Sequence, residues 1–346
     1  MIPRTAPSCQ SEDAQSLQAE CPSSHWQAAL ADAFRDPIEL LKYLDLPISL
    51  LNGATAAAHS FALRAPRGYC QRIEKGNLDD PLLQQILPVG SELIESKQFG
   101  HDPVGDLASI EVPGLLHKYH GRALIITTAA CAVHCRYCFR RHFPYQENRS
   151  EQNWQEAVDY IRTHADIHEV ILSGGDPLSL TESRLKKLTD QLLTIPHLKT
   201  LRLHTRLPIV LPQRVNNDLL NWLGSLPWKI VMVLHCNHAN EIDESVADAL
   251  QQLHEHQITL LNQSVLLARV NDHAEILIQL SEKLFSNHVL PYYLHLLDKV
   301  QGAQHFYIND DKARQLHSEI RQRLPGYLVP KLVKEEAGKK SKTAII

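Results

Sequence analysis

Cys131-Ala-Val-His-Cys135-Arg-Tyr-Cys138-Phe-Arg140-Arg141-His142 is a cysteine-rich segment with C-x3-C-x2-C spacing. The apolar, β-branched run 124–128 leads directly into it. A strand that ends in a tight cysteine loop is suited to hold a metal cluster at the mouth of a barrel. Three thiolates would leave one iron of a four-iron cluster without a protein ligand. Such an open iron is a place for chemistry, so the segment indicates an enzyme.

A zinc knuckle is the alternative interpretation of the three cysteines. Zinc prefers a fourth tight ligand, for which His134 and His142 are candidates. A second Cys or His pair at finger spacing is absent from the sequence. Three arginines, Arg136, Arg140 and Arg141, lie within the segment, and we expect their positive charge to help lower the pKa of the thiols.

Composition narrows the class of protein and its partners. The 346 residues are 44% hydrophobic and 21% charged, as in an ordinary globular protein, with a net charge of -4. This charge gives no reason to expect nucleic acid or an anionic membrane as a partner. No apolar run approaches the roughly 20 residues of a spanning helix, and the start lacks the apolar part of a secretory signal. The seven cysteines are odd in number and mostly scattered, which favours a reducing, cytoplasmic location.

The pattern along the chain predicts four regions. Residues 1–24 are expected to be a flexible tail, 25–112 a mainly helical N-terminal region, 113–300 a barrel of alternating strands and helices, and 301–346 a short C-terminal segment. Six apolar, β-branched runs are expected to be strands: 122–128, 168–173, 199–204, 229–235, 258–265 and 290–297. Six βα units fall short of a closed eight-stranded barrel. We therefore expect an α/β fold with a partial, open (βα)6 barrel rather than a doubly wound sheet, although periodicity alone does not decide between them.

Ser173-Gly-Gly-Asp176-Pro follows the second of these strands and has two interpretations. The glycines would let a ligand approach the backbone closely, and the carboxylate could accept a hydrogen bond from an ammonium group. Alternatively, the segment is an ordinary turn in which Asp176 caps the next helix.

Together with the cysteine loop, several further motifs resemble the radical S-adenosylmethionine superfamily and, within it, the lysine 2,3-aminomutases. These motifs are Pro113-Gly-Leu-Leu-His-Lys-Tyr, Cys138-Phe-Arg-Arg, His204-Thr-Arg-Leu-Pro, Asn237-His-Ala-Asn-Glu-Ile and Gly326-Tyr-Leu-Val-Pro. Phe139-Arg-Arg-His-Phe-Pro-Tyr and Tyr292-Tyr-Leu-His are most similar to the short bacterial branch that supplies (R)-β-lysine for modification of elongation factor P. The resemblance implies a radical-SAM barrel and conversion of L-lysine to (R)-β-lysine. It also implies an electron donor of flavodoxin or ferredoxin type and, downstream, the elongation factor P lysyl ligase pathway.

The resemblance also implies three cofactors and the residues that bind them. Cys131, Cys135 and Cys138 would ligate a [4Fe–4S] cluster, while Gly174, Gly175 and Asp176 would bind S-adenosyl-L-methionine. Pyridoxal 5'-phosphate would form an imine with Lys342 and be gripped by Lys118 and Arg122. On residue chemistry alone, Lys342 would be read as a solvated tail lysine. Ala344 replaces a proline of the family's lysine motif, so Lys339 and Lys340 stay open as alternatives.

One cationic and two anionic side chains would bind the substrate lysine. The resemblance implies Arg140 for its carboxylate, which a guanidinium clasps in a bidentate fork, and Asp298 and Glu335 for an amine. His204, Arg206, Asn237 and His238 lie at expected strand ends and are plausible liners of the mouth without an assigned role. Two rivals remain: a radical S-adenosylmethionine enzyme without pyridoxal phosphate, and a zinc-bearing interaction module.

Overall fold

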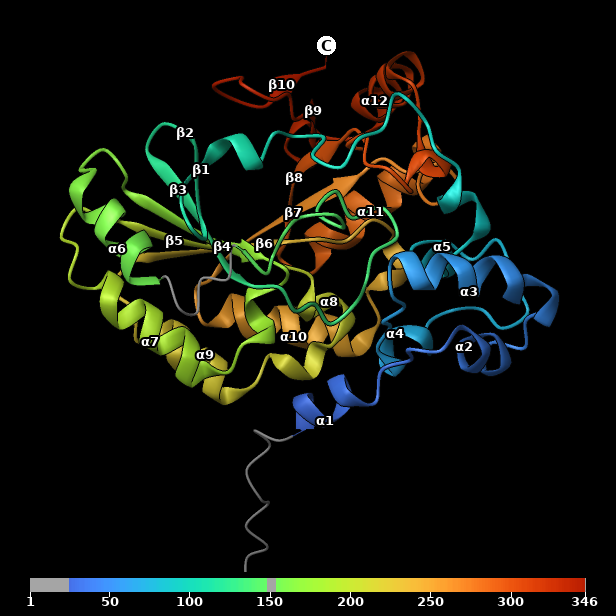
Figure 1. Ribbon diagram of the computed structural model, residues 1–346, viewed down its shortest axis with the longest axis horizontal. Helices are drawn as coiled ribbons and strands as arrows, with labels where there is room; N and C mark the ends of the chain where they lie inside the picture. Colours follow the sequence, from blue (N-terminus) through green and yellow to red (C-terminus); the bar gives the residue numbers. More distant parts are fainter. Residues whose placement is uncertain (1–24, 148–153, 346) are drawn as a thin grey trace, which may run out of the picture.

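The computed structural model describes residues 25–147 and 154–345, and it shows an open α/β barrel with helices on its outer face (Figure 1). Ten strands form one sheet in chain order. They are β1 (Ile110–Val112), β2 (Leu115–Tyr119), β3 (Arg122–Thr128), β4 (Glu169–Gly174), β5 (Thr200–Thr205), β6 (Lys229–Leu234), β7 (Thr259–Val265), β8 (Leu290–His295), β9 (Lys331–Lys334) and β10 (Thr343–Ala344). Within the described residues no pairing joins β1 to β10, so the expected partial barrel is confirmed.

The parallel part of the sheet has one strand more than the sequence predicted. Strands β3 to β8 are the six predicted strands, and each pairs in parallel with the next. Strand β9 from the C-terminal segment adds to β8 in the same direction and makes a seventh. At the two edges, β1 and β2 pair antiparallel before β3, and β10 folds back antiparallel on β9. The six expected βα units are therefore confirmed, and β9 is an additional parallel strand.

Helices cover the outer face of the sheet with their apolar stripes. The connecting helices are α6 (Trp154–Thr163), α7 (Glu182–Leu192), α8 (Leu207–Val210), α9 (Asn217–Gly224), α10 (Glu244–Glu255) and α11 (Ala274–Ser286), and α12 (Asp310–Arg323) follows β8. Residues one helical turn apart are buried together, as Leu185, Leu188 and Leu192 are in α7. This spacing explains why sequence periodicity located these helices.

The N-terminal region is helical, as expected, and packs at one side of the barrel (Figure 1). Its helices are α1 (His25–Ala31), α2 (Pro37–Tyr43), α3 (Leu51–Ser60), α4 (Arg67–Cys70) and α5 (Pro81–Gln84). Asp36 and Asp80 cap α2 and α5 through side-chain hydrogen bonds, each followed by proline. Strand β1 begins at Ile110, three residues before the boundary expected at 113. The expected tail, 1–24, lies outside the described residues.

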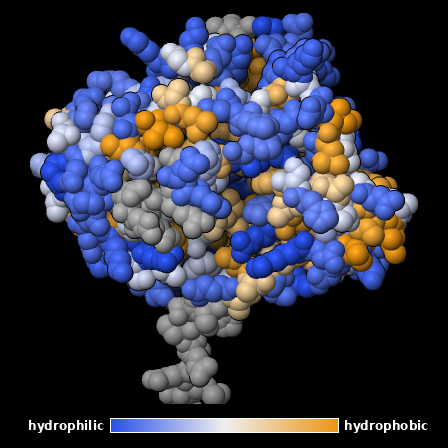
Figure 2. All heavy atoms as spheres, viewed as in Figure 1, coloured by the Kyte–Doolittle hydropathy of each residue, from blue (hydrophilic) through white to orange (hydrophobic). Residues whose placement is uncertain are grey.

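One continuous apolar core joins this region to the barrel. It includes Trp26, Phe34 and Tyr69 from the N-terminal region together with Leu172 and Met232 from the barrel strands. The surface is mostly hydrophilic on the face in Figure 2, with hydrophobic side chains gathered over α2 and α3. Among the described residues, no helix is both long and apolar enough to cross a membrane.

Candidate active site

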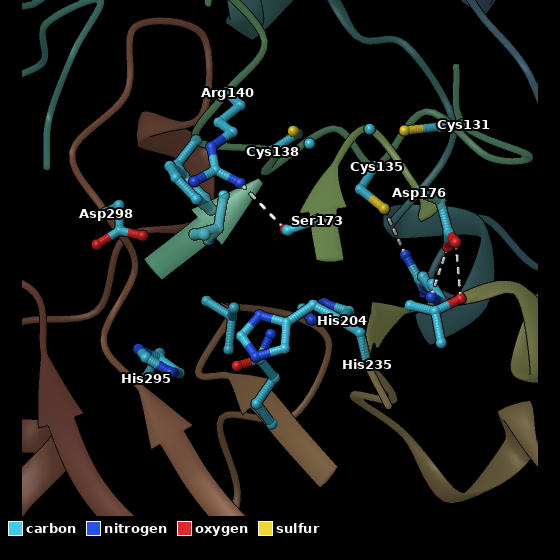
Figure 3. A pocket seen from close by; sticks show the side chains of 18 of the residues that line it. Cys131, Cys135, Cys138, Arg140, Ser173, Asp176, His204, His235, His295 and Asp298 are labelled. Carbon is cyan, nitrogen blue, oxygen red and sulfur yellow. Dashed lines mark hydrogen bonds between the residues drawn. The ribbon is translucent and has the colours of Figure 1, made fainter. Parts of the chain in front are cut away.

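A cavity of about 500 Å³ lies at the carboxyl ends of the parallel strands and reaches into the barrel (Figure 3). All residues with a predicted site role line it: Lys118, Arg122, Cys131, Cys135, Cys138, Arg140, Gly174, Gly175, Asp176, Asp298, Glu335 and Lys342. The fold therefore brings the cysteine loop and the C-terminal lysine, more than two hundred residues apart in the chain, to one space.

The cysteine loop is held from behind by a short segment of the N-terminal region, residues 61–64. The backbone N–H of His134 donates to the carbonyl of Arg64 at 2.9 Å, and its ring Nδ1 lies 2.8 Å from the carbonyl oxygen of Ala62. Arg136 donates through Nη1 to the carbonyl of Phe61 at 2.8 Å, and its guanidinium lies 4.8 Å from the centre of that ring. The helical region is thus part of the support of the cysteine loop.

The three arginines of the loop are paired with carboxylates. Arg136 and Arg141 both donate to Oε2 of Glu92, at 2.6 and 2.8 Å, and all three side chains are almost fully buried. Arg140 donates through Nε to Asp106 at 2.7 Å. These two carboxylates therefore offset part of the positive charge near the thiols.

Arg140 and Arg141 do act to lower the pKa of the Cys138 thiol, as expected, but burial outweighs them. Burial raises the pKa of Cys138 to about 11, with the nearby Cys135 adding to the effect, and Arg140 and Arg141 oppose it only in part. Burial likewise raises the pKa of Cys131 well above its usual value. A thiolate needs either water or a positive partner, and burial removes the water. A bound metal would supply that positive charge.

The glycine loop packs directly against the start of the cysteine loop. Gly175 donates its N–H to the carbonyl of Thr128 at 2.7 Å, and Asp176 donates its N–H to that of Ala130 at 2.8 Å. A Cβ atom at Gly175 would lie 2.4 Å from the oxygen of Ala130, and Gly174 adopts φ +114°. Both positions thus require glycine, and the two loops form one wall of the cavity.

The Asp176 carboxylate caps a short helical turn and also binds the residues at and after the end of β5. Oδ1 accepts from Leu178 N at 3.0 Å and Thr205 Oγ1 at 2.7 Å, and Oδ2 accepts from the N–H groups of Arg206 and Leu207 at 2.7 and 3.2 Å. Burial raises its pKa to about 6, against the effect of these hydrogen bonds. The helix-cap interpretation is confirmed for the 3₁₀ turn Pro177–Ser179, while a contact with a ligand stays a prediction.

Five alternating charges run along one side of the cavity. Lys342 Nζ donates to Glu335 at 2.6 Å, and Lys118 Nζ lies 3.2 Å from the other oxygen of Glu335. Lys118 Nζ also lies 2.6 Å from Asp106, which in turn accepts from Arg140. Burial would raise the pKa of Glu335, but Lys342 and Lys118 outweigh burial and lower it to about 2. The residues predicted to bind the phosphate, the pyridoxal group and the substrate are therefore electrostatically linked through Asp106, which the sequence did not single out.

Asp298 differs from Glu335 because no described residue forms a hydrogen bond or ion pair with its carboxylate. In Figure 3 its carboxylate lies across the cavity from Cys131. Burial, reinforced by repulsion from Glu335, raises its pKa to about 7, against attraction by Lys342. An acid in this state accepts a cationic ligand readily, because pairing with an ammonium group removes the cost of ionising it.

Two further polar groups lie in the cavity wall without a hydrogen-bond partner among the described residues. Arg122 has no acidic partner there, and its guanidinium rests 4.8 Å from the centre of the Tyr119 ring. His204 Nε2 is buried with no hydrogen-bond partner. Burial lowers the pKa of His204 well below its usual value, with nearby Arg202 contributing, so the ring is neutral. A cation and a neutral polar ring thus remain available to a bound polar molecule.

The expectation for the unassigned liners was half right. His204 and Arg206 line the cavity, whereas Asn237 and His238 do not. Asn237 is buried and bonds Tyr137 at 2.8 Å, and His238 caps the 3₁₀ turn Ala239–Glu241. Both were wrongly placed because the chain turns away from the cavity after β6.

Many of the other lining residues had no predicted role, and Asp106, Ser173, Tyr145, His235 and His295 are polar examples. Ser173, His235 and His295 lie at the carboxyl ends of β4, β6 and β8. Because active groups of such barrels lie at these strand ends, the sequence could have identified all three. Asp106 and Tyr145 lie in loops, where no comparable rule applies. Tyr145 OH donates to the carbonyl of Gly174 at 3.0 Å.

The side chains present fit the implied cofactors. No three His, Cys, Asp or Glu side chains in residues 25–147 and 154–345 are arranged to hold a single metal ion. A zinc ion needs its ligands about 2.3 Å from one centre, whereas a four-iron cluster takes each thiolate on a different iron. The cysteines therefore fit a cluster better than zinc. Lys342, Arg122 and the unpartnered His204 supply an amine, a cation and a polar ring for a phosphorylated aldehyde in the same cavity.

Comparisons with known proteins agree with this chemistry. Residues 125–213 match the Radical SAM superfamily. The chain is 50% identical over 323 residues to the L-lysine 2,3-aminomutase of Escherichia coli strain K12, covering 92% of this chain and 94% of that protein. It is 49% identical to the enzyme of the same name from Haemophilus influenzae, covering 92% and 95%. With the L-lysine 2,3-aminomutase of Clostridium subterminale it shares 32% identity, covering 93% of this chain and 77% of that one.

Proposed function

The chain belongs to the L-lysine 2,3-aminomutase family of radical S-adenosylmethionine isomerases, and on that premise we propose that it converts L-lysine to (R)-β-lysine. The observation that carries the proposal is the shared cavity, which Cys131, Cys135, Cys138 and Lys342 all line. A radical enzyme of another class would need the cysteines but not a lysine and a set of paired charges facing them.

Cys131, Cys135 and Cys138 would ligate three irons of a [4Fe–4S] cluster, leaving the fourth for S-adenosyl-L-methionine. When bound, the cluster and S-adenosyl-L-methionine supply a hydrogen-abstracting radical after one-electron reduction. Gly174 and Gly175 would let this cofactor approach the backbone beside the cysteines. Asp176 would support that site mainly by fixing the loop, since four donors already occupy its carboxylate.

Pyridoxal 5'-phosphate is the third cofactor, and when bound it carries the migrating nitrogen. Lys342 would bond its aldehyde carbon, and Glu335 would orient Lys342, as their 2.6 Å contact supports. Arg122 would be the main phosphate ligand, because no described acid competes for it. Lys118 would contribute only if it leaves Asp106 or Glu335, its present partners.

The substrate would lie between Arg140 and Asp298. Arg140 donates to Asp106 and, at 3.3 Å, to Ser173 Oγ, so it is fixed in direction and keeps Nη2 for a carboxylate. Asp298 would hold the side-chain ammonium group of lysine, because it is the acid in the cavity without a partner among the described residues. Glu335 would then act on the amine of Lys342 more than on substrate. The surrounding barrel would exclude water from reactive species.

The proposal extends to the cellular role. The β-lysine would be supplied to the elongation factor P lysyl ligase pathway in the cytoplasm, and a flavodoxin or ferredoxin would deliver the electron. Support for this extension comes from the segments Phe139–Tyr145 and Tyr292–His295, which resemble the short bacterial branch.

Borohydride reduction of the pyridoxal-loaded protein, followed by peptide mapping, tests the assignment of Lys342. We expect a reduced pyridoxyl adduct on Lys342, lost in Lys342→Ala and retained in the Lys339→Ala and Lys340→Ala controls. An adduct on Lys339 or Lys340 would move the assignment, and no adduct at all would favour a radical enzyme without pyridoxal. Anaerobic reconstitution that gives zinc, without iron and sulfide, would favour the interaction module.

A further inference from the structure

Arg206 is a buried arginine that touches a cysteine of the loop. It follows β5, and its Nη1 lies 2.7 Å from Cys135 Sγ and 2.7 Å from the hydroxyl of Tyr137. Figure 3 shows this contact as a dashed line from Cys135, at the wall that also carries Asp176. In the part of the chain that the structure describes, no other side chain forms a hydrogen bond to the sulfur of Cys131, Cys135 or Cys138.

The arginines within the cysteine loop do not share this contact. The side chains of Arg136, Arg140 and Arg141 are turned to Glu92 and Asp106 instead. The positive group that contacts a cysteine of the loop is therefore Arg206, which lies more than sixty residues after the loop in the chain.

Arg206 is fixed at both its backbone and its guanidinium. Its N–H donates to Asp176 at 2.7 Å, while Nη2 donates to Gln85 at 2.7 Å and to Glu241 at 2.8 Å. Glu241 is fully buried and also accepts from the N–H of Asn237 at 2.8 Å. Because Glu241 and Gln85 hold Nη2, the planar guanidinium places Nη1 at Cys135 without further loss of side-chain entropy.

We infer that Arg206 is a positioning residue that sets the reduction potential of the cluster, an inference that rests on the proposed cluster. Reduction adds one electron to the oxidised cluster, and the added negative charge is shared with the thiolate sulfurs. A hydrogen bond from a cation to one of those sulfurs stabilises the reduced form more than the oxidised form. The guanidinium at Cys135 therefore makes the cluster easier to reduce by the low-potential donor that the reaction needs.

The Arg206→Lys variant tests this inference with the charge and fold preserved. A single ammonium group cannot reach both Glu241 and Cys135, and we expect it to stay with Glu241, where the buried charge is paired. Arg214→Lys is the matched control. Arg214 is also buried and pairs with Glu182 at 2.7 Å, but its other hydrogen bonds go to the carbonyls of Leu178 and Leu180.

Both variants and the unmodified protein would be reconstituted anaerobically, analysed for iron, and titrated with dithionite while the EPR signal of the reduced cluster is recorded. At a fixed potential, the ratio of reduced to oxidised cluster is expected to fall about tenfold in Arg206→Lys, equivalent to 59 mV for one electron. Arg214→Lys should titrate like the unmodified protein.

Three results separate the inference from the proposed function. Equal titrations for Arg206→Lys and Arg214→Lys, with full iron content, would overturn the role of Arg206. Failure of Arg206→Lys alone to hold iron would also overturn it, because Arg206 would then serve assembly and not potential. Absence of a cluster in the unmodified protein would instead remove the proposed function itself.

Discussion

Asp106 balances two cations that the proposed reaction needs in defined positions. It is 3% exposed and accepts from Arg140 while pairing with Lys118. Arg140 and Lys118 lower its pKa although burial opposes them, so it is ionised. Removing this charge would leave buried Arg140 without a carboxylate partner among the described residues, and would leave Lys118 with Glu335 alone, which also pairs with Lys342.

Asp106→Asn is therefore expected to lower the free energy of unfolding by about 3 kcal/mol, as when one partner of a buried ion pair is removed. Urea denaturation measures the change. Asp159→Asn is the control, because Asp159 forms an exposed pair with Arg162 and should change stability by less than about 0.5 kcal/mol. Equal effects of the two substitutions would contradict the structural role of Asp106.

Asp298 makes substrate binding depend on pH near neutrality. Its pKa in the empty cavity is raised to about 7, and only the ionised carboxylate pairs with an ammonium group. Lowering the pH through this value protonates it. Between pH 7 and pH 6 the ionised fraction falls from about one half to about one tenth, so the apparent affinity for lysine should fall about fivefold.

Equilibrium binding of lysine to the cofactor-loaded, unreduced enzyme measures this dependence. Asp298→Asn should bind weakly at every pH and lose the step between pH 6 and pH 8. If the affinity of the unmodified enzyme for lysine did not change with pH over that range, Asp298 would be ruled out as the residue that binds the amine.

Among individual residues, the sequence identified those that a motif spacing or a position at the end of a strand marks as functional. The cysteines were identified by spacing, and Asp176 by its glycine neighbours. Asp106 and the Cys135 contact of Arg206 depend on elements far apart in sequence, so no local pattern contains them. The net pKa of the thiols could not be predicted for the same reason, since burial, which raises the pKa of Cys131 and Cys138, arises only in the folded chain.

Among the elements, the hairpin of β9 and β10 positions Lys342. Thr343 pairs with Lys334, and the N–H of Ile345 donates to Leu332 at 3.0 Å. The Ile345 side chain is 8% exposed and packs in the same apolar cluster as Leu332. This anchor keeps the strand, and with it the lysine, against the cavity.

Ile345→Ala is expected to release the hairpin and reduce the borohydride-trapped pyridoxyl adduct at Lys342 several-fold. Ile308→Ala is the matched control, because Ile308 is 9% exposed in the same cluster but lies outside the hairpin. Each substitution removes a similar buried side chain, at a cost of about 2 to 4 kcal/mol. Equal labelling in the two variants would show that the hairpin does not position Lys342.

Element prediction succeeded where burial imposes a period on the sequence. Strands β3 to β8 are apolar runs because helices cover the sheet. Strand β9 was missed because Lys331-Leu-Val-Lys334 has only two apolar residues, both buried by neighbours that the local sequence does not reveal. Strands β1 and β2 were missed because both are short and antiparallel, β1 has no buried residue, and the burial of β2 does not alternate along the strand.

For the whole molecule, the shared core predicts that the N-terminal region and the barrel unfold together. Trp26 packs over the guanidinium of Arg214 at 4.6 Å and belongs to the same cluster as Trp222. In urea, tryptophan fluorescence and far-UV circular dichroism should report one coincident transition. Two separated transitions would show that residues 25–112 form an independent unit.

The central claim is that one cavity unites radical and pyridoxal chemistry on lysine. Its most direct test is product analysis after anaerobic incubation of the fully reconstituted, reduced enzyme with free L-lysine and S-adenosyl-L-methionine. The account predicts β-lysine of R configuration, resolved by chiral chromatography, and no product from Lys342→Ala. Unchanged lysine from protein with an intact, reducible cluster and a pyridoxyl adduct on Lys342 would contradict it.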